Sequence, residues 1–382
     1  MSAVRQRLDL DDADGLIGAD REGLLRGASM AGAQVRAVAA ALDEGALARL
    51  GSEQPRCLIW VAGRGPAATA GAMLAATLAP VAAAPMVLTP TVPPWIGALD
   101  VLVLAGDDPA DPALVHAAGV GVRRGARVVV AAPLEGPLRD AVAGRAAELA
   151  PRLPVPDEFG LSRYLAVGLA VAGAIDPAAR LDLAALADDL DAEALRNSAG
   201  RDLFTNPAKI LAQRISGHAT VLAGDCAATL ALARHAAEVL LRVGHRVVAA
   251  AGLADALVAL HTGLAGTGGA DVAALFHDEE LDGPLPDRPL VLVPTLVADR
   301  AVAEARTAGY GDVELIGIGD VAPGGEPAGE GRPVDDGLPS PERSPVAGAP
   351  AAALRPEPQL AVLAVRLEMA AAYLRLVEGA AS

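Results

Sequence analysis

Residues 57–65 read CLIWVAGRG, a continuous apolar run that ends in two glycines flanking an arginine. A strand that is apolar at every position is typical of a parallel sheet buried on both faces. An uncharged, alanine-rich stretch follows the second glycine, and its composition suits a helix. The order of strand, glycine turn and helix predicts the first βα unit of an α/β fold.

The same alternation of apolar strands and helical stretches recurs along the chain. Residues 100–104, DVLVL, and residues 126–131, ARVVVA, resemble strands, and a helix is expected between 134 and 150. A second series begins at residues 219–225, ATVLAGD, where another apolar strand precedes a glycine turn. Two successive series of the same type indicate an internal duplication. We therefore predict an α/β fold with two doubly wound parallel sheets flanked by helices in one chain.

Composition also predicts the domain organisation. An Asp- and Leu-rich helical bridge separates the two series, and a Pro/Gly-rich stretch, expected to be a disordered surface loop, precedes a closing amphipathic helix. The predicted boundaries are residues 1–50 for a leading helical segment, 51–175 for the first α/β domain, 176–214 for the bridge, 215–321 for the second α/β domain, 322–357 for the loop and 358–382 for the last helix.

Charge and composition disfavour several classes of function. The formal net charge is −16 and only 2% of residues are aromatic, so nucleic acid is not expected as a partner. The N-terminus lacks the apolar core of a signal peptide, and prolines interrupt the uncharged residues 65–99, so we expect a cytoplasmic protein and no membrane contact. The two cysteines and six histidines lack metal-binding spacing, and no metal is expected.

The turn after the first strand carries candidate ligand contacts. Gly63 and Gly65 would let backbone N–H groups approach an anion at a helix N-terminus. Arg64 between them would face either that anion or solvent. A dinucleotide fold would also need an acid after the second strand, and residues 65–99 contain none, so we expect no nicotinamide and no other cofactor.

Two further turns carry carboxylates. Asp107 and Asp108 follow the strand at 100–104, and each would oppose a phosphate by about 1 kcal/mol per charge pair at 4 Å in water, and by more in a protein cleft. Asp111 is expected to cap the next helix, with a ligand contact as the alternative. In the second series, Gly224 and Asp225 form the counterpart of the first glycine turn, and Asp225 is either a helix cap or a ligand contact.

The order of these motifs resembles the double sugar isomerase (SIS) domain family, particularly the bifunctional phosphoglucose/phosphomannose isomerases. The features that carry the resemblance are residues 8–12 (LDLDD), 61–65 (VAGRG), 93–95 (PPW), 124–128 (RGARV), 206–212 (NPAKILA) and the turn at 224–225. The resemblance implies two SIS-like domains, a homodimer, and a sugar phosphate or related carbohydrate as the ligand. The implied reaction is aldose–ketose isomerisation of glucose 6-phosphate and mannose 6-phosphate.

The positions that match the family's catalytic residues hold other side chains. The family's proton-shuttling glutamate falls on or beside Leu241, and its ring-opening histidine falls near Ala256. Asp107 and Asp108 stand where the family has a Ser/Thr run that grips phosphate. The nearest groups that could substitute are Glu238, Asp255 and His245, for which helix-surface or cap roles are the alternative. Two functions stay open: an isomerase that uses such substitutes, and a non-catalytic binding or regulatory protein, a pseudoenzyme of the same fold.

Overall fold

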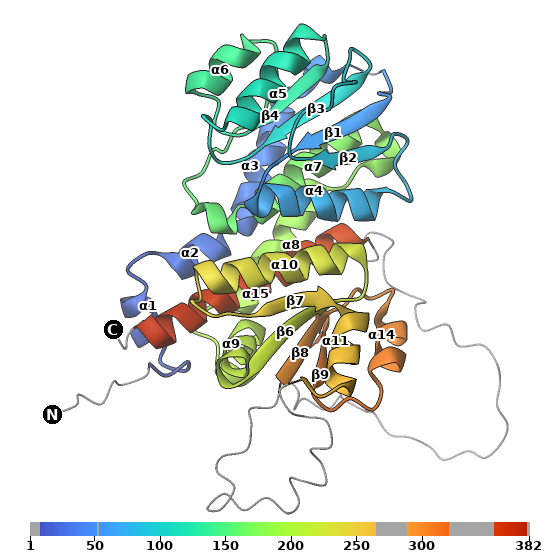
Figure 1. Ribbon diagram of the computed structural model, residues 1–382. Helices are drawn as coiled ribbons and strands as arrows, with labels where there is room; N and C mark the ends of the chain where they lie inside the picture. Colours follow the sequence, from blue (N-terminus) through green and yellow to red (C-terminus); the bar gives the residue numbers. More distant parts are fainter. Residues whose placement is uncertain (1–7, 52, 265–288, 321–354, 380–382) are drawn as a thin grey trace, which may run out of the picture.

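A computed structural model describes residues 8–51, 53–264, 289–320 and 355–379. It has two parallel sheets, each with helices on both faces (Figure 1), which confirms the predicted α/β fold. The first sheet has the strand order β2-β1-β3-β4-β5 and the second has the order β7-β6-β8-β9. The strands are β1 (Cys57–Val61), β2 (Met86–Thr89), β3 (Asp100–Ala105), β4 (Arg127–Ala131), β5 (Ala147–Glu148), β6 (Ala219–Gly224), β7 (Ala249–Gly252), β8 (Pro289–Pro294) and β9 (Val313–Ile316).

Helices separate the strands and also fill the space between the two sheets. They are α1 (Ala13–Ala19), α2 (Leu24–Ser29), α3 (Ala31–Asp43), α4 (Gly65–Leu78), α5 (Pro112–Arg123), α6 (Gly136–Val142), α7 (Leu161–Ile175), α8 (Leu183–Arg196), α9 (Pro207–Gly217), α10 (Ala227–Arg242), α11 (Leu253–His261), α14 (Arg300–Thr307) and α15 (Pro356–Gly379). Within the described ranges, no helix is long and apolar enough to cross a membrane.

Strand β1 shows why the deciding stretch is apolar at every position. Leu58 and Trp60 face the core between the two sheets, whereas Ile59 and Val61 face the core under α5 and α6. Side chains alternate between the faces of a strand, so a strand covered on both sides must be apolar throughout. The buried indole N–H of Trp60 has a hydrogen-bond partner, because Nε1 donates to the carbonyl of Ala67, 2.9 Å away.

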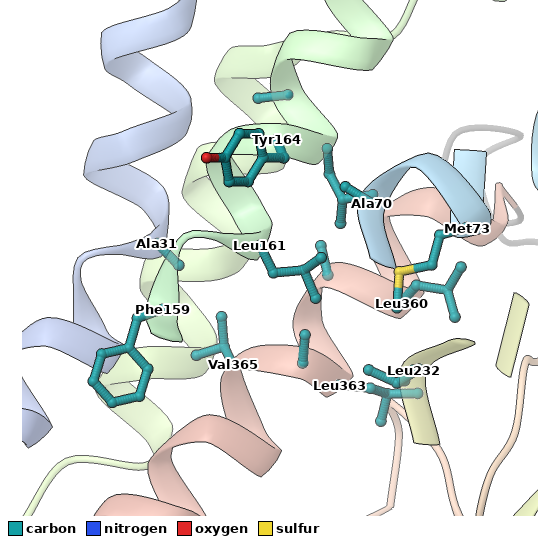
Figure 2. Packing of buried hydrophobic residues seen from close by; sticks show 14 of the residues in the cluster. Ala31, Ala70, Met73, Phe159, Leu161, Tyr164, Leu232, Leu360, Leu363 and Val365 are labelled. Atoms are coloured by element: carbon teal, nitrogen blue, oxygen red, sulfur yellow. The ribbon is translucent and has the colours of Figure 1, made fainter. Parts of the chain in front are cut away.

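A single hydrophobic core joins the two halves of the molecule. Helices α3, α4 and α7 cover one face of the first sheet; α4 packs against α10 and α15 of the second half, and α7 packs against α15 (Figure 1). Figure 2 shows Met73 of α4, Leu161 of α7, Leu232 of α10 and Leu363 of α15 in this core. The two sheets are therefore parts of one folding unit rather than loosely tethered domains.

Helix α15 differs from the amphipathic closing helix predicted from the sequence. Every residue from 356 to 378 is buried or half-buried, because the helix runs between α8, α9 and α10. Its charges are neutralised internally: Arg366 Nε lies 2.7 Å from Glu193 Oε1, and Glu368 Oε1 lies 2.8 Å from His235 Nε2. Charged residues suggested a solvated face, but here they are paired inside the protein.

One predicted helix is shorter than the sequence suggested. The stretch from 134 to 150 forms α6 and then the two-residue strand β5, which pairs with β4. Ala143 and Gly144 adopt positive φ angles of 48° and 69°, which end α6 and turn the chain back to the sheet. Of the loop predicted at 322–357, residues 322–354 lie outside the described residues. Residues 356 and 357 belong to α15.

We expect the loss of one partner of the buried Arg366–Glu193 pair to destabilise the protein strongly. Both side chains are about 1% exposed, and Arg366 also donates to the carbonyl of Gly317. Arg366→Met would leave the buried carboxylate of Glu193 without this positive charge. The free energy of unfolding, measured by chemical denaturation, should fall by roughly 3–5 kcal/mol. Arg36→Met breaks exposed pairs with Asp188 and Asp191 and serves as the control, with an expected loss of about 1 kcal/mol or less. Equal losses in the two variants would contradict the assignment.

Candidate functional site

A large cavity lies where the strand order of the first sheet reverses. The chain passes from β1 to β2 on one side and then crosses to β3 on the other, so the loops after β1 and β3 diverge. Ligands of open α/β sheets bind at such switch points, at the carboxyl ends of the strands. This β1–β3 cavity has a volume of about 690 Å³. Its lining comprises residues 63–66 after β1, residues 105–109 and Asp111 after β3, Asp157, and Glu238, Leu241 and Arg242 of α10.

The glycine turn after β1 forms one wall of the β1–β3 cavity. Gly65 has a φ of 64°, a conformation that disfavours other residues, and Pro66 follows it in the first turn of α4. Arg64 is exposed at the N-cap position and lines the cavity. Among the described residues, its guanidinium has no hydrogen-bond or ion-pair partner, so it remains available to a ligand.

The loop after β3 brings carboxylates to the same cavity. Asp107 and Asp108 both line it. Asp108 Oδ1 accepts from the backbone N–H of Ala110 at 2.8 Å, which turns the loop. Asp111 accepts from the N–H of Ala113 at 2.8 Å, so its predicted role as the cap of α5 is confirmed, although it also reaches the cavity.

Helix α10 closes the β1–β3 cavity from the second half of the chain. Leu241 is 54% exposed and lines the cavity, with Glu238 about one turn before it. Arg242 also lines the cavity, and its Nη2 lies 2.6 Å from Glu158 Oε1. The site thus combines the first sheet with a helix of the second half, held in place because α10 packs on α4.

The other residues selected from the sequence do not line this cavity. Asp225 accepts from the Thr229 hydroxyl at 2.7 Å, but the N-cap of α10 is Cys226, so Asp225 precedes the cap and holds the Thr229 side chain. Gly224 has no room for a side chain, since an added Cβ would lie 2.2 Å from the backbone N of Leu230. Asp255 belongs to the first turn of α11, on the outer face of the second sheet.

His245 also lies elsewhere, in the turn after α10. Its Nδ1 is 3.1 Å from Arg375 of α15, and its φ is 51°. No histidine is among the residues that line the β1–β3 cavity. His245 therefore lies outside the cavity in which it would have to act as a substitute for the family's histidine.

Sequence reasoning missed Asp157, which enters the cavity from the short 3₁₀ helix at Asp157–Phe159. The pKa of its carboxyl is raised, first by loss of solvation and then by the neighbouring charges of Asp107 and Glu158. No local motif marks this residue, because it lies some fifty positions after Asp107 and only the fold joins them. The only sign of Asp157 in the sequence is that it and Glu158 form an acidic pair between β5 and α7.

The electrostatics of the β1–β3 cavity are dominated by negative charge. Five carboxylates and two arginines line it, and one arginine, Arg242, is paired with Glu158. The described residues include no group of three or more His, Cys, Asp or Glu side chains placed to hold a metal ion. The cavity can accept hydrogen bonds from ligand donors at several points, and it opposes a phosphate more strongly than a neutral group.

Comparisons with known proteins find similarity in structure but not in sequence. No family model matches the chain, and no curated protein matches it. A glucose-6-phosphate isomerase like protein from Thermus thermophilus is 18% identical with a TM-score of 0.51, covering 97% of this chain and 94% of that one. The C-terminal domain of glucosamine-fructose-6-phosphate aminotransferase from Francisella tularensis is 10% identical with a TM-score of 0.53, covering 93% and 96%.

A third structure, a hypothetical protein that also comes from Thermus thermophilus, is 13% identical with a TM-score of 0.57, covering 96% of this chain and 89% of that one. At such identities the likeness establishes the fold and leaves the chemistry of the site open. The resemblance to the SIS family is thus confirmed at the level of the fold: the chain has the double-sheet α/β architecture of sugar-phosphate isomerase-like proteins.

Proposed function

We propose that the chain is a non-catalytic carbohydrate-binding protein that retains the ligand cavity of the SIS fold but does not isomerise sugar phosphates. One observation carries this proposal: the β1–β3 cavity presents Asp107 and Asp108 after β3 and Leu241 on α10. The resemblance places a phosphate grip and a proton-shuttling glutamate at those positions. The cavity thus lies at the switch point of the first sheet and is lined by polar groups, without the groups that the reaction uses.

The missing groups matter because isomerisation needs positioned acids and bases. A proton must leave C2 and arrive at C1, and a second group must open the sugar ring. Each such group contributes about 10²- to 10⁴-fold to the rate, so a cavity without them falls several orders of magnitude short of an isomerase. Carboxylates remain good ligands for sugar hydroxyls, which donate hydrogen bonds to them. We therefore expect the cavity to bind carbohydrates without isomerising sugar phosphates.

A coupled assay tests the loss of catalysis. Purified protein is incubated with fructose 6-phosphate, and the formation of glucose 6-phosphate and mannose 6-phosphate is followed. We expect rates at the level of the buffer control, and the same rates for Glu238→Gln. A shift in the melting temperature with a carbohydrate panel checks, in parallel, that the protein binds such ligands. Enzyme-level turnover by wild-type protein would contradict the proposal.

A second candidate function is isomerisation of glucose 6-phosphate and mannose 6-phosphate with Glu238 as the base. It rests on the position of Glu238, which lines the β1–β3 cavity from α10, one turn before Leu241. If this candidate holds, wild-type protein turns over fructose 6-phosphate, and Glu238→Gln lowers the rate by about 100-fold or more. Glu304→Gln on α14, an exposed glutamate outside the cavity, is the matched control and leaves the rate unchanged.

The crowding of carboxylates in the cavity should lower stability at neutral pH. The pKa of Asp157 is raised in the folded protein, so protonation of this residue favours folding, and that contribution is lost as the pH rises through the raised pKa. Asp157→Asn removes the penalty and should raise the melting temperature at pH 7 by about 1 °C. The difference should shrink as the pH falls towards 4. A lower melting temperature for the variant at pH 7 would show that the charge stabilises the fold.

The cytoplasmic location and the homodimer stay predictions. The first rests on the sequence of the N-terminus, and the second rests on the resemblance to the SIS family. Neither changes the experiments above, which use the protein as it is purified.

A further inference from the structure

Asp107 differs from the other carboxylates of the β1–β3 cavity because buried side chains fix it from behind. Its Oδ1 accepts a hydrogen bond from the hydroxyl of Tyr164, a residue of α7 with no exposed surface. Burial raises the pKa of Tyr164, so the phenol keeps its proton and remains a donor. The hydrogen bond therefore persists over the whole physiological pH range.

Arg163 completes the support of Asp107. Its guanidinium lies 4.0 Å from the centre of the Tyr164 ring, and its Nη1 donates to the carbonyl of Ala131 at 3.0 Å. Its Nη2 is 3.7 Å from the same Oδ1 of Asp107, and the arginine side chain is only 9% exposed. Arg163 is thus held in one place, and it contributes a nearby positive charge without a direct hydrogen bond to the carboxylate.

Both contacts engage one oxygen of Asp107 and leave the other available. Among the described residues, Oδ2 of Asp107 accepts no hydrogen bond, and the side chain is 29% exposed where it lines the cavity. A carboxylate whose orientation is fixed by one oxygen presents the second at low entropic cost to a ligand. Asp108 and Asp111 are each held by a backbone N–H of the adjacent chain segment instead of by buried side chains.

We infer that Asp107 determines the ligand specificity of the β1–β3 cavity: its free oxygen accepts a hydrogen bond from a ligand hydroxyl or ammonium group, and the cavity takes an unphosphorylated carbohydrate, preferably one that carries an amine. This inference rests on the proposed function and narrows its ligand class. It assigns Tyr164 and Arg163 as positioning residues, which act on the ligand through Asp107.

Charge supports the same ligand class. A phosphate dianion near Asp107 would meet Asp108 and Asp157 as well, and among the cavity-lining cations only Arg64 has no partner in the described part of the chain. An ammonium group would meet attraction from the same carboxylates, and a neutral hydroxyl would pay little for desolvation. The cavity therefore discriminates against the phosphorylated form of a sugar that it would otherwise accept.

Titration calorimetry at low salt tests the inference. The probes are glucosamine, glucose and mannose, each with its 6-phosphate. We expect each unphosphorylated sugar to bind wild-type protein at least about tenfold more tightly than its own 6-phosphate, with glucosamine the tightest of the three. Because glucosamine carries an amine where glucose carries a hydroxyl, the ratio of their affinities measures the effect of replacing the hydroxyl by an ammonium group.

Variants identify the residue that is responsible. Asp107→Asn should reduce the affinity ratio between each sugar and its 6-phosphate by at least about threefold and reduce the advantage of glucosamine, while Asp108 and Asp157 retain part of the discrimination. Tyr164→Phe keeps the charge but frees Asp107 to rotate, and it should weaken sugar binding by about three- to tenfold while the sugar stays preferred over its phosphate. Asp140→Asn, which removes an exposed carboxylate of α6 outside the cavity, is the control and should match wild type.

The outcomes separate this inference from the proposed function. Equal or tighter binding of the 6-phosphates by wild-type protein overturns the inference and leaves carbohydrate binding intact. The same holds if Asp107→Asn, folded as judged by its circular dichroism, behaves like Asp140→Asn. If none of the six probes binds, the proposed function is contradicted and the inference fails with it. The preference of wild-type protein and the Tyr164→Phe result decide the question even if Asp107→Asn does not fold.

Discussion

The burial of α15 between the two sheets is the constraint on which the rest of the structure depends. The helix contacts α4 and α7 of the first half and α8, α9 and α10 of the rest, so both halves lose part of their core without it. The Arg366–Glu193 ion pair and the hydrogen bond between Glu368 and His235 add directionality to this packing. Arg366 ties α15 to Glu193 of α8 and to the carbonyl of Gly317 after β9, and Glu368 ties it to His235 of α10. Apolar contacts alone would allow the helix to rotate or slide, whereas charged groups deep in a core must meet their partners.

The candidate site inherits its geometry from this arrangement. Helix α10 lies between α15 and α4, and its position brings Glu238 and Leu241 over the loops that follow β1 and β3. The β1–β3 cavity is therefore a consequence of how the two halves pack, as well as of the switch point in the first sheet. A change in the core at α15 would move one wall of the cavity without touching any residue that lines it.

The site also shows that backbone form and ligand chemistry have different determinants. The turn with Gly63 and Gly65 and the start of α4 have the form that suits an anion, yet the loop after β3 offers Asp107 and Asp108. Backbone form follows from packing and from glycine conformations, whereas ligand chemistry follows from a few side chains that packing hardly constrains. Asp107 illustrates the second category, because buried Tyr164 and Arg163 hold its carboxylate in place at the edge of the cavity.

The sequence by itself determined the α/β class, the two parallel sheets and the glycine turn that begins α4, because strands buried on both faces must be apolar at each position and turns need glycine locally. It also singled out Asp107, Asp108 and Glu238 as candidate site residues, and all three line the β1–β3 cavity. Only the tertiary structure decided that α15 is buried on nearly all sides, that Asp157 joins the cavity and that Asp225, Asp255 and His245 stay outside it. These outcomes depend on contacts between residues far apart in the chain, such as Glu368 with His235 and Tyr164 with Asp107, for which no local pattern exists.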